Sequence, residues 1–179
     1  LFLELFAGSL SFMLEMVLAR IPALLPWDSK YGEEFDVFTS GASLLALARG
    51  GYVSSSHLGT PCQSMTWCRT PQLRSAEFPK GLPGLNDSQR QLVSLGNSLL
   101  WFSVHYCTIL HSLGCYFSLK NPQLSWLWVQ PEMLELYAWD GVAYVLVYYR
   151  DYGTPYMKPT LIFHNSPTRH EIRTPSGPL

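Results

Sequence analysis

Short apolar runs alternate with apolar-periodic segments along this chain, and this alternation constrains the fold more than any other feature of the sequence. The expected strands are 2–6, 23–26, 52–58, 115–119, 142–149 and 161–163, and the expected helices are 10–20, 40–49 and 86–113, with shorter helical pieces at 124–128 and 131–139. Strands that alternate with helices form mostly parallel sheets, because each helix carries the chain back across the sheet. We therefore predict an α/β fold with a doubly wound, mostly parallel sheet and helices on both faces.

A chain of 179 residues, 47% hydrophobic and 14% charged, is expected to form one globular domain. We place that domain at 1–164, and we expect the Pro-, Ser- and Arg-rich segment 165–179 to be an unstructured tail. No apolar stretch approaches the roughly 18 residues that a membrane span needs. The first residues lack an initiator Met and a basic region, so we expect that they are not a signal peptide. We expect the chain to be a fragment of a longer protein or a degenerate copy.

The sequence Gly-Thr-Pro-Cys-Gln-Ser at 59–64 follows the expected strand 52–58. Parallel strands present their ligands at the carboxyl edge of a sheet, so this order predicts a thiol at such an edge. Pro61 fixes its own φ and restricts Thr60, which gives Cys62 a defined direction. The alternative is that Cys62 is a small buried hydrophobic residue, as most free cysteines are.

A second pattern lies at the N-terminus, where the strand 2–6 ends in Ala7-Gly8-Ser9 before an expected helix. A glycine in such a turn lets the backbone approach a nucleotide cofactor. Asp28 follows 20 residues after Gly8, the spacing at which a carboxylate accepts hydrogen bonds from ribose hydroxyls, and Trp27 offers a face for adenine. The alternative for Asp28 is a turn or a helix cap.

The charged and sulfur-bearing residues exclude several classes of site. The four cysteines at 62, 68, 107 and 115 lack zinc-site spacing and are too few for a disulfide framework, so we expect reduced thiols and no metal. A net charge of −1 gives no overall basic excess for nucleic acid. A local basic patch is the remaining candidate for DNA contact, and it comprises Arg69, Arg74, Lys80 and Arg90; the alternative is an ordinary solvated loop.

Four motifs together resemble the DNA (cytosine-5) methyltransferase family. They are Leu5-Phe6-Ala7-Gly8, Gly59-Thr60-Pro61-Cys62-Gln63-Ser64, Lys120-Asn121-Pro122 and Tyr152-Gly153-Thr154-Pro155, in the order in which that family carries them. The resemblance implies a Rossmann-like, S-adenosyl-L-methionine-dependent methyltransferase fold with one antiparallel strand. It also implies DNA as partner, with the long segment 63–85 closing over a flipped base.

The resemblance assigns roles to individual residues. It implies cofactor contacts from Phe6, Ala7, Gly8, Asp36 and Pro61, beside Trp27 and Asp28, and catalytic roles for Cys62, Lys120, Asn121 and Lys158. The chain departs from the family at Leu10, where a glycine is usual, and at Lys120, where a glutamate is usual. Lys158 stands for the first of two arginines, while Tyr156 and Thr160 replace a glutamine and the second arginine.

Three functions remain open at this point. The first is a methyltransferase in which the Cys62 thiolate adds to C6 of cytosine. The second is an inactive, decayed copy that keeps the fold. The third is a cysteine-dependent hydrolase that uses His57 as the partner of Cys62. We expect an intracellular protein, nuclear in a eukaryote and otherwise cytoplasmic, that acts as a monomer or as part of a larger polypeptide.

Overall fold

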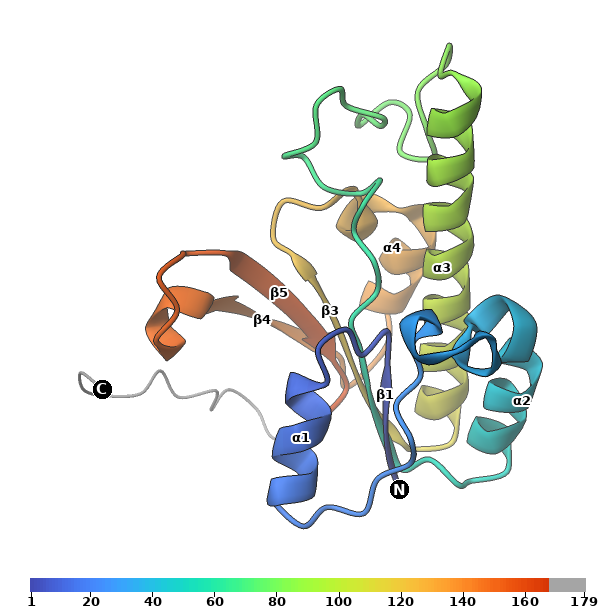
Figure 1. The fold of residues 1–179 in the computed structure, drawn as a ribbon, viewed down its shortest axis with the longest axis vertical. Coiled ribbons are helices and arrows are strands. Elements are labelled where there is room, and N and C mark those ends of the chain that lie inside the picture. The colour runs from blue at the N-terminus through green and yellow to red at the C-terminus, as the bar shows by residue number, and fades with distance from the viewer. Residues whose placement is uncertain (168–179) are drawn as a thin grey trace. The chain divides into compact units, whose positions relative to one another are not determined.

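The computed structural model describes residues 1–167 and has an α/β architecture (Figure 1). One mixed sheet has the strand order β1-β2-β3-β5-β4. Its strands are β1 (Phe2–Leu5), β2 (Ser55–Leu58), β3 (Tyr116–Pro122), β4 (Ala143–Tyr148) and β5 (Pro159–His164). The α-helices of the described part are α1 (Ser11–Leu18), α2 (Val37–Arg49), α3 (Asp87–Ser112) and α4 (Pro131–Tyr137). The predicted α/β class is confirmed at this level.

The chain divides into two compact units. The first unit joins Leu1–Pro61 to Leu99–Leu119, and the second joins Cys62–Ser98 to the chain from Lys120 onward. The sequence predicts a single domain over 1–164. The residues expected to bind the cofactor all belong to the first unit, and the residues expected to be catalytic all belong to the second.

The first unit carries helices on both faces of its parallel strands. β1 pairs with β2 and β2 pairs with β3, both in parallel. The Ser56 hydroxyl bonds the Tyr106 hydroxyl of α3 at 2.9 Å, whereas the ring of His57 packs on Phe12 of α1 with a centroid separation of 4.5 Å. Consecutive residues of a strand point to opposite faces, so α3 and α1 cover opposite sides of β2.

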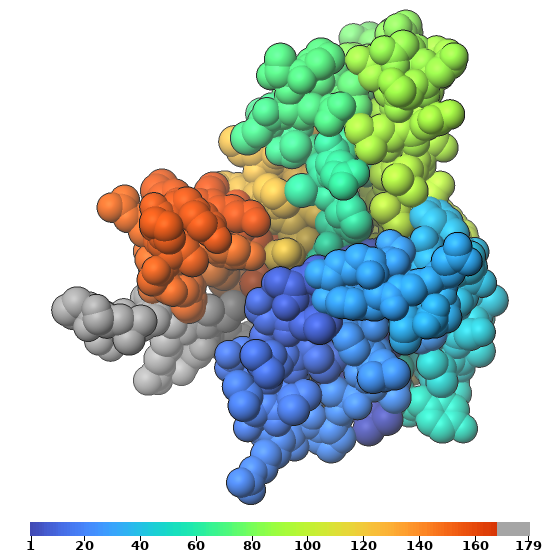
Figure 2. Space-filling view, in the orientation of Figure 1, coloured from blue at the N-terminus to red at the C-terminus, as the bar shows by residue number. Residues whose placement is uncertain are grey.

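The helix α1 is apolar on more than its packed side. Met13 is its one buried residue, and exposed apolar side chains extend over the rest of its surface at Phe12, Leu14, Val17 and Leu18. This segment, in dark blue, forms part of the surface in the view of Figure 2.

The expected strand 23–26 is reduced to two isolated parallel bridges, Phe2 with Ala23 and Leu5 with Trp27. Backbone hydrogen bonds still run along β1, for example from Trp27 N to Glu4 O at 2.8 Å and from Phe6 N to Trp27 O at 2.7 Å. Pro26 has no N–H to donate, which interrupts a regular ladder. The segment therefore follows β1 and places Asp28 just beyond its carboxyl end.

The second unit contains the antiparallel hairpin of β4 and β5, with Ala143 opposite His164 and Tyr148 opposite Pro159. The short helix α4 begins at Pro131, a residue that suits the first helical turn because its missing N–H would have no partner there. Within residues 1–167, no helix has the length and hydropathy needed to cross a membrane. Residues 168–179 of the predicted tail 165–179 lie outside the described part of the chain.

Candidate functional site

The turn after β1 has an unusual backbone. Phe6, Gly8 and Leu10 have φ values of 54°, 55° and 61°, so three of five consecutive residues are left-handed. Glycine tolerates this region, whereas a leucine there is strained because its Cβ approaches the carbonyl oxygen. Leu10 therefore occupies a position whose backbone conformation favours glycine.

This turn is joined to Asp28 by a hydrogen bond. The Gly8 N–H donates to Asp28 Oδ2 at 2.8 Å, and the Tyr31 hydroxyl donates to the Gly8 carbonyl at 2.6 Å. A Cβ built on Gly8 would meet no heavy atom within 4 Å, so there is open space beside the turn. Gly8 and Asp28 thus lie together at the carboxyl edge of β1.

Asp28 also caps a short 3-10 helix, because its Oδ1 accepts the Lys30 N–H at 3.0 Å. Both the ligand reading and the cap reading consequently apply to the same half-buried side chain. Each carboxylate oxygen accepts one amide here and has a second acceptor position that a ribose hydroxyl can use.

Trp27 and Asp36 lie in the same unit. The Trp27 ring packs edge-on against Phe35 at 6.0 Å, and its buried indole Nε1 has no hydrogen-bond partner in the described part of the chain. Asp36 is the N-cap of α2, with Oδ1 accepting the Phe38 N–H at 2.7 Å. Asp36 therefore has a structural role as a helix cap, and the cofactor contact that the resemblance implies for it stays a prediction.

Glu4 is a residue that the sequence reading did not assign. Its side chain is 4% exposed, and its Oε2 accepts the Met13 N–H at 2.8 Å. The N-cap residue of α1 is Leu10, which offers no side-chain acceptor. Glu4 therefore caps α1 from β1, and the signal in the sequence was an acidic residue within an otherwise apolar strand.

The segment that leads to Cys62 is anchored on the first unit. The Gly59 N–H donates to the Leu5 carbonyl at 3.0 Å, and the buried Thr60 hydroxyl lies 2.9 Å from that of Ser103 on α3. Gly59 to Pro61 thus extend from the carboxyl end of β2, the same edge at which β1 ends. Pro61 is half-buried, as is Cys62.

The second unit begins at Cys62 with a single helical turn. The Cys62 carbonyl accepts the N–H groups of Met65 at 2.9 Å and Thr66 at 3.0 Å. The residues after this turn pair with another segment of the same unit, because Trp126 N donates to Met65 O and Trp67 N donates to Leu124 O. The rings of Trp67 and Trp126 lie 4.7 Å apart on this short ladder.

Lys120 and Asn121 lie at the end of β3, as predicted. Lys120 is half-buried and directly follows Leu119, the register partner of Leu58. Asn121 is 1% exposed. Lys158 lies between β4 and β5, and its Nζ is 5.1 Å from the centre of the Tyr149 ring. In the described residues, no hydrogen bond or ion pair joins the side chains of Cys62, Lys120 and Lys158.

Within the expected basic patch, Arg74 does not lie at the surface. Arg74 is 1% exposed and has every guanidinium N–H bonded within the protein. Lys80 pairs with Glu132, and Arg90 pairs with Asp87. The sequence does not reveal the partners of Arg74, because its acceptors are neutral groups of Ser64, Pro79, Val93 and Asn97.

The histidine of the hydrolase alternative has other contacts. His57 Nδ1 lies 2.8 Å from the Ser118 hydroxyl, and its ring packs on Phe12.

No group of three or more His, Cys, Asp or Glu side chains within residues 1–167 is placed to hold a metal ion. No protein-family model and no curated protein sequence matches this chain.

Proposed function

We propose that this chain is an S-adenosylmethionine-dependent, DNA (cytosine-5) methyltransferase-like protein, with Cys62 as the nucleophile that adds to C6 of a flipped cytosine. The hydrogen bond between Gly8 and Asp28 carries the proposal. An adenosyl site needs a glycine turn at the end of one strand and an acid at the end of its neighbour. These two parts meet at the carboxyl edge of β1, 2.8 Å apart.

The residues present fit such a cofactor in three respects. Gly8 borders open space, which leaves room for a ligand against the turn. Asp28 keeps acceptor capacity for a vicinal diol, because each of its oxygens accepts only one amide. The unpartnered Nε1 of Trp27 is a buried donor that a polar atom of a ligand would satisfy. When bound, S-adenosylmethionine supplies the methyl group.

The protein side of the reaction depends on Cys62. Its thiolate forms a bond to C6, and the electron pair of the C5–C6 double bond moves to C5, which takes the methyl group. Loss of the C5 proton to water restores the double bond and breaks the bond between Sγ and C6. Lys120 at the end of β3 is the group proposed to face the base, and its ammonium donates hydrogen bonds only.

A second candidate function is a protein that binds the cofactor without efficient methyl transfer. Two observations favour it. Leu10 occupies a position with a left-handed backbone, at which the family has glycine, and a leucine in that conformation is strained. Lys120 replaces the acid that would stabilise charge on the ring. The two candidates differ in turnover and share the cofactor site.

Calorimetry with S-adenosylmethionine and S-adenosylhomocysteine tests the proposal on the whole chain. We expect binding to the native protein and its loss in Asp28→Ala, while Asp87→Ala, an exposed acid of the second unit, binds as the native protein does. Absence of binding in all three proteins, or equal binding in all three, refutes the assignment. A labelled-methyl assay on cytosine-containing DNA then separates the active protein from the second candidate.

A further inference from the structure

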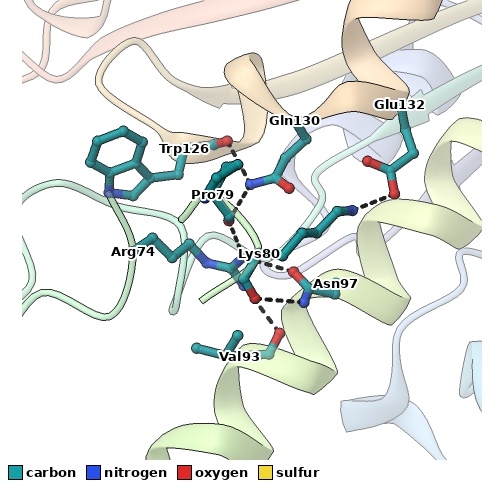
Figure 3. A network of polar contacts seen from close by, with 8 residues as sticks. All are labelled: Arg74, Pro79, Lys80, Val93, Asn97, Trp126, Gln130 and Glu132. Atoms are coloured by element: carbon teal, nitrogen blue, oxygen red, sulfur yellow. Dashed lines mark hydrogen bonds and ion pairs between the residues drawn. The ribbon is translucent and has the colours of Figure 1, made fainter. Parts of the chain in front are cut away.

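Arg74 belongs to the second unit, and its hydrogen-bond acceptors come from the segment 62–85 and from the first half of α3 (Figure 3). It lies in the long segment after Cys62 and is 1% exposed. The five donated hydrogen bonds are Nε to Ser64 O at 2.9 Å, Nη1 to Pro79 O and to Asn97 Oδ1 at 2.7 Å each, and Nη2 to Ser64 Oγ and to Val93 O at 3.0 Å each. A guanidinium has five N–H groups, so none remains for an external ligand.

The acceptors are all neutral: three main-chain carbonyls, one hydroxyl and one amide. Burial lowers the pKa of Arg74 to about 10, so the group still carries its charge at neutral pH. Burial of a cation without a carboxylate partner is unfavourable in free energy. The hydrogen bonds that the rigid guanidinium donates offset this desolvation. Arg74 therefore acts as a rigid cross-link between the segment 62–85 and α3.

Ser64 is the point at which this cross-link meets α3. Both its carbonyl and its hydroxyl accept from Arg74. A Cβ on Gly96 of α3 would lie 2.2 Å from Ser64 Oγ and 3.2 Å from Arg74 Nη2. A glycine in a helix interior weakens the helix, so its presence here is explained by this close approach.

Asn97, the next residue of α3, extends the same contact. Its Oδ1 accepts from Arg74, and its Nδ2 donates to the Lys80 carbonyl at 3.0 Å (Figure 3). Gln130 Nε2 donates to Pro79 O at 2.6 Å and to Trp126 O at 3.0 Å. These contacts hold the segment after Cys62 at Ser64, Arg74, Pro79 and Lys80. The closing of this segment over a base, which the resemblance implies, stays a prediction.

Ser64 is two residues from Cys62, within the turn that the Cys62 carbonyl closes. On the other side of Cys62, Pro61 restricts the backbone. We propose that Arg74 is the positioning residue of Cys62: by holding the carbonyl and hydroxyl of Ser64 against Gly96, it sets the direction of the Cys62 thiol. This inference rests on the role proposed for Cys62 above.

Alkylation of individual cysteines by iodoacetamide, resolved by peptide mass spectrometry, tests the inference without cofactor or DNA. The measured quantity is the rate at Cys62 divided by the rate at Cys68, which is exposed on the same segment. Buried Cys107 reports general unfolding in the same sample. Because the assay needs no methyl transfer, its result is separate from the outcome of the cofactor experiment.

We expect Arg74→Met to raise this ratio by about tenfold while Cys107 stays unmodified, since loss of the cross-link frees the Cys62 turn. Arg74→Lys keeps the charge but loses the fork, and we expect an intermediate ratio. Arg90→Met, which removes an exposed arginine of the same unit, leaves the ratio unchanged. An unchanged ratio in Arg74→Met, or labelling of Cys107 in step with Cys62, overturns the inference.

A double-mutant cycle keeps the inference testable if Arg74→Met does not fold. Gly96→Ala is expected to displace Ser64 and raise the ratio in the native background. In Ser64→Ala the hydroxyl that a Cβ would meet is absent, so Gly96→Ala should have a smaller effect there. An equal effect of Gly96→Ala in both backgrounds shows that Cys62 is not held through Ser64.

Discussion

The Glu4 carboxylate of β1 accepts the Met13 amide in the first turn of α1, at 2.8 Å and in a buried position. This bond replaces the side-chain cap that Leu10 cannot provide. It ties the start of α1 to the strand that leads into the Gly8 turn. Glu4 therefore links β1 to the first turn of α1, on either side of the Gly8 turn in the sequence.

Replacement of Glu4 by leucine should lower the free energy of unfolding by about 1–3 kcal/mol, because the Met13 N–H is then buried without an acceptor. Glu4→Gln keeps an acceptor oxygen and should lose less. Urea unfolding of the three proteins measures the difference, with hydrogen exchange at the Met13 amide as the local readout. Equal stability of the leucine and native proteins would show that the cap has no net effect.

Leu10→Gly should stabilise the protein and strengthen cofactor binding. Glycine adopts the left-handed backbone at φ 61° without the penalty of about 1 kcal/mol that a leucine has there. Removal of the side chain also widens the turn beside Gly8. Arg20→Gly is the matched control, because Arg20 has φ 58° after the other end of α1 and is exposed. It should gain stability without a change in affinity measured by calorimetry.

The sequence predicted the elements that depend on local periodicity. Strand 2–6, the long helix after Asn86 and the strand before Lys120 agree with β1, α3 and β3 within a few residues. The segment 23–26 forms only isolated bridges with β1 in place of the expected strand, and Pro26 lacks the N–H that a regular ladder needs. Hydrophobic periodicity predicts which face of a helix or strand is buried. It does not predict how many backbone hydrogen bonds the segment forms.

The parts of the site that the sequence did not reveal depend on long-range contacts. Arg74 was taken for a surface charge, although its acceptors are at Ser64, Pro79, Val93 and Asn97. The available signal was Gly96, an isolated glycine in a helical pattern, which indicates that another segment approaches closely. Gly8 and Asp28, by contrast, were assigned to one site from their spacing, although the hydrogen bond between them was not predicted.

Stability should fall in alkali because of Cys107. Burial raises the pKa of the Cys107 thiol, so above about pH 8.5 the unfolded chain binds fewer protons than the native state. The free energy of unfolding should therefore fall by about 2 kcal/mol from this group between about pH 8.5 and 10. Cys107→Ala removes this loss, at a cost of about 1–2 kcal/mol at neutral pH for the cavity.

Urea unfolding at both pH values compares the native protein with Cys107→Ala and with Cys68→Ala, a substitution at an exposed position. The gap between the native and Cys107→Ala proteins should close as the pH rises, whereas Cys68→Ala should follow the native protein. Parallel curves for all three would mean that Cys107 does not contribute to the alkaline loss.

Cys62 should be the only cysteine that traps DNA. A fluorine at C5 of cytosine prevents loss of a proton from the adduct, so a reactive thiolate leaves a covalent complex that denaturing gels detect. Cys62→Ser should abolish this band, and Cys68→Ser should retain it. Cys107 is buried and Cys115 half-buried, so serine at either position should also retain the band. A band that survives Cys62→Ser excludes Cys62 as the nucleophile.

Lys120→Glu should raise methyl transfer by at least about one order of magnitude, the size expected when a positioned acid is restored. A carboxyl shares its proton with N3 of cytosine and accepts from the exocyclic amine, whereas an ammonium only donates and is a compact point charge. The Lys120 side chain makes no hydrogen bond or ion pair with any described residue, so the substitution breaks no such contact. Lys120→Gln, which removes the charge without supplying an acid, is the matched control and should stay slow.

The measurement is incorporation of labelled methyl groups into cytosine-containing DNA by all three proteins at matched cofactor saturation. A native protein that is already fast and is slowed by glutamate would show that Lys120 itself has a catalytic role. Equal gains from glutamate and glutamine would mean that loss of the positive charge, rather than the new acid, is responsible. If none of the three turns over while all bind the cofactor, the defect lies outside Lys120. Leu10→Gly combined with Lys120→Glu then becomes the decisive variant, because it supplies the glycine and the acid that the resembled family carries at these two positions.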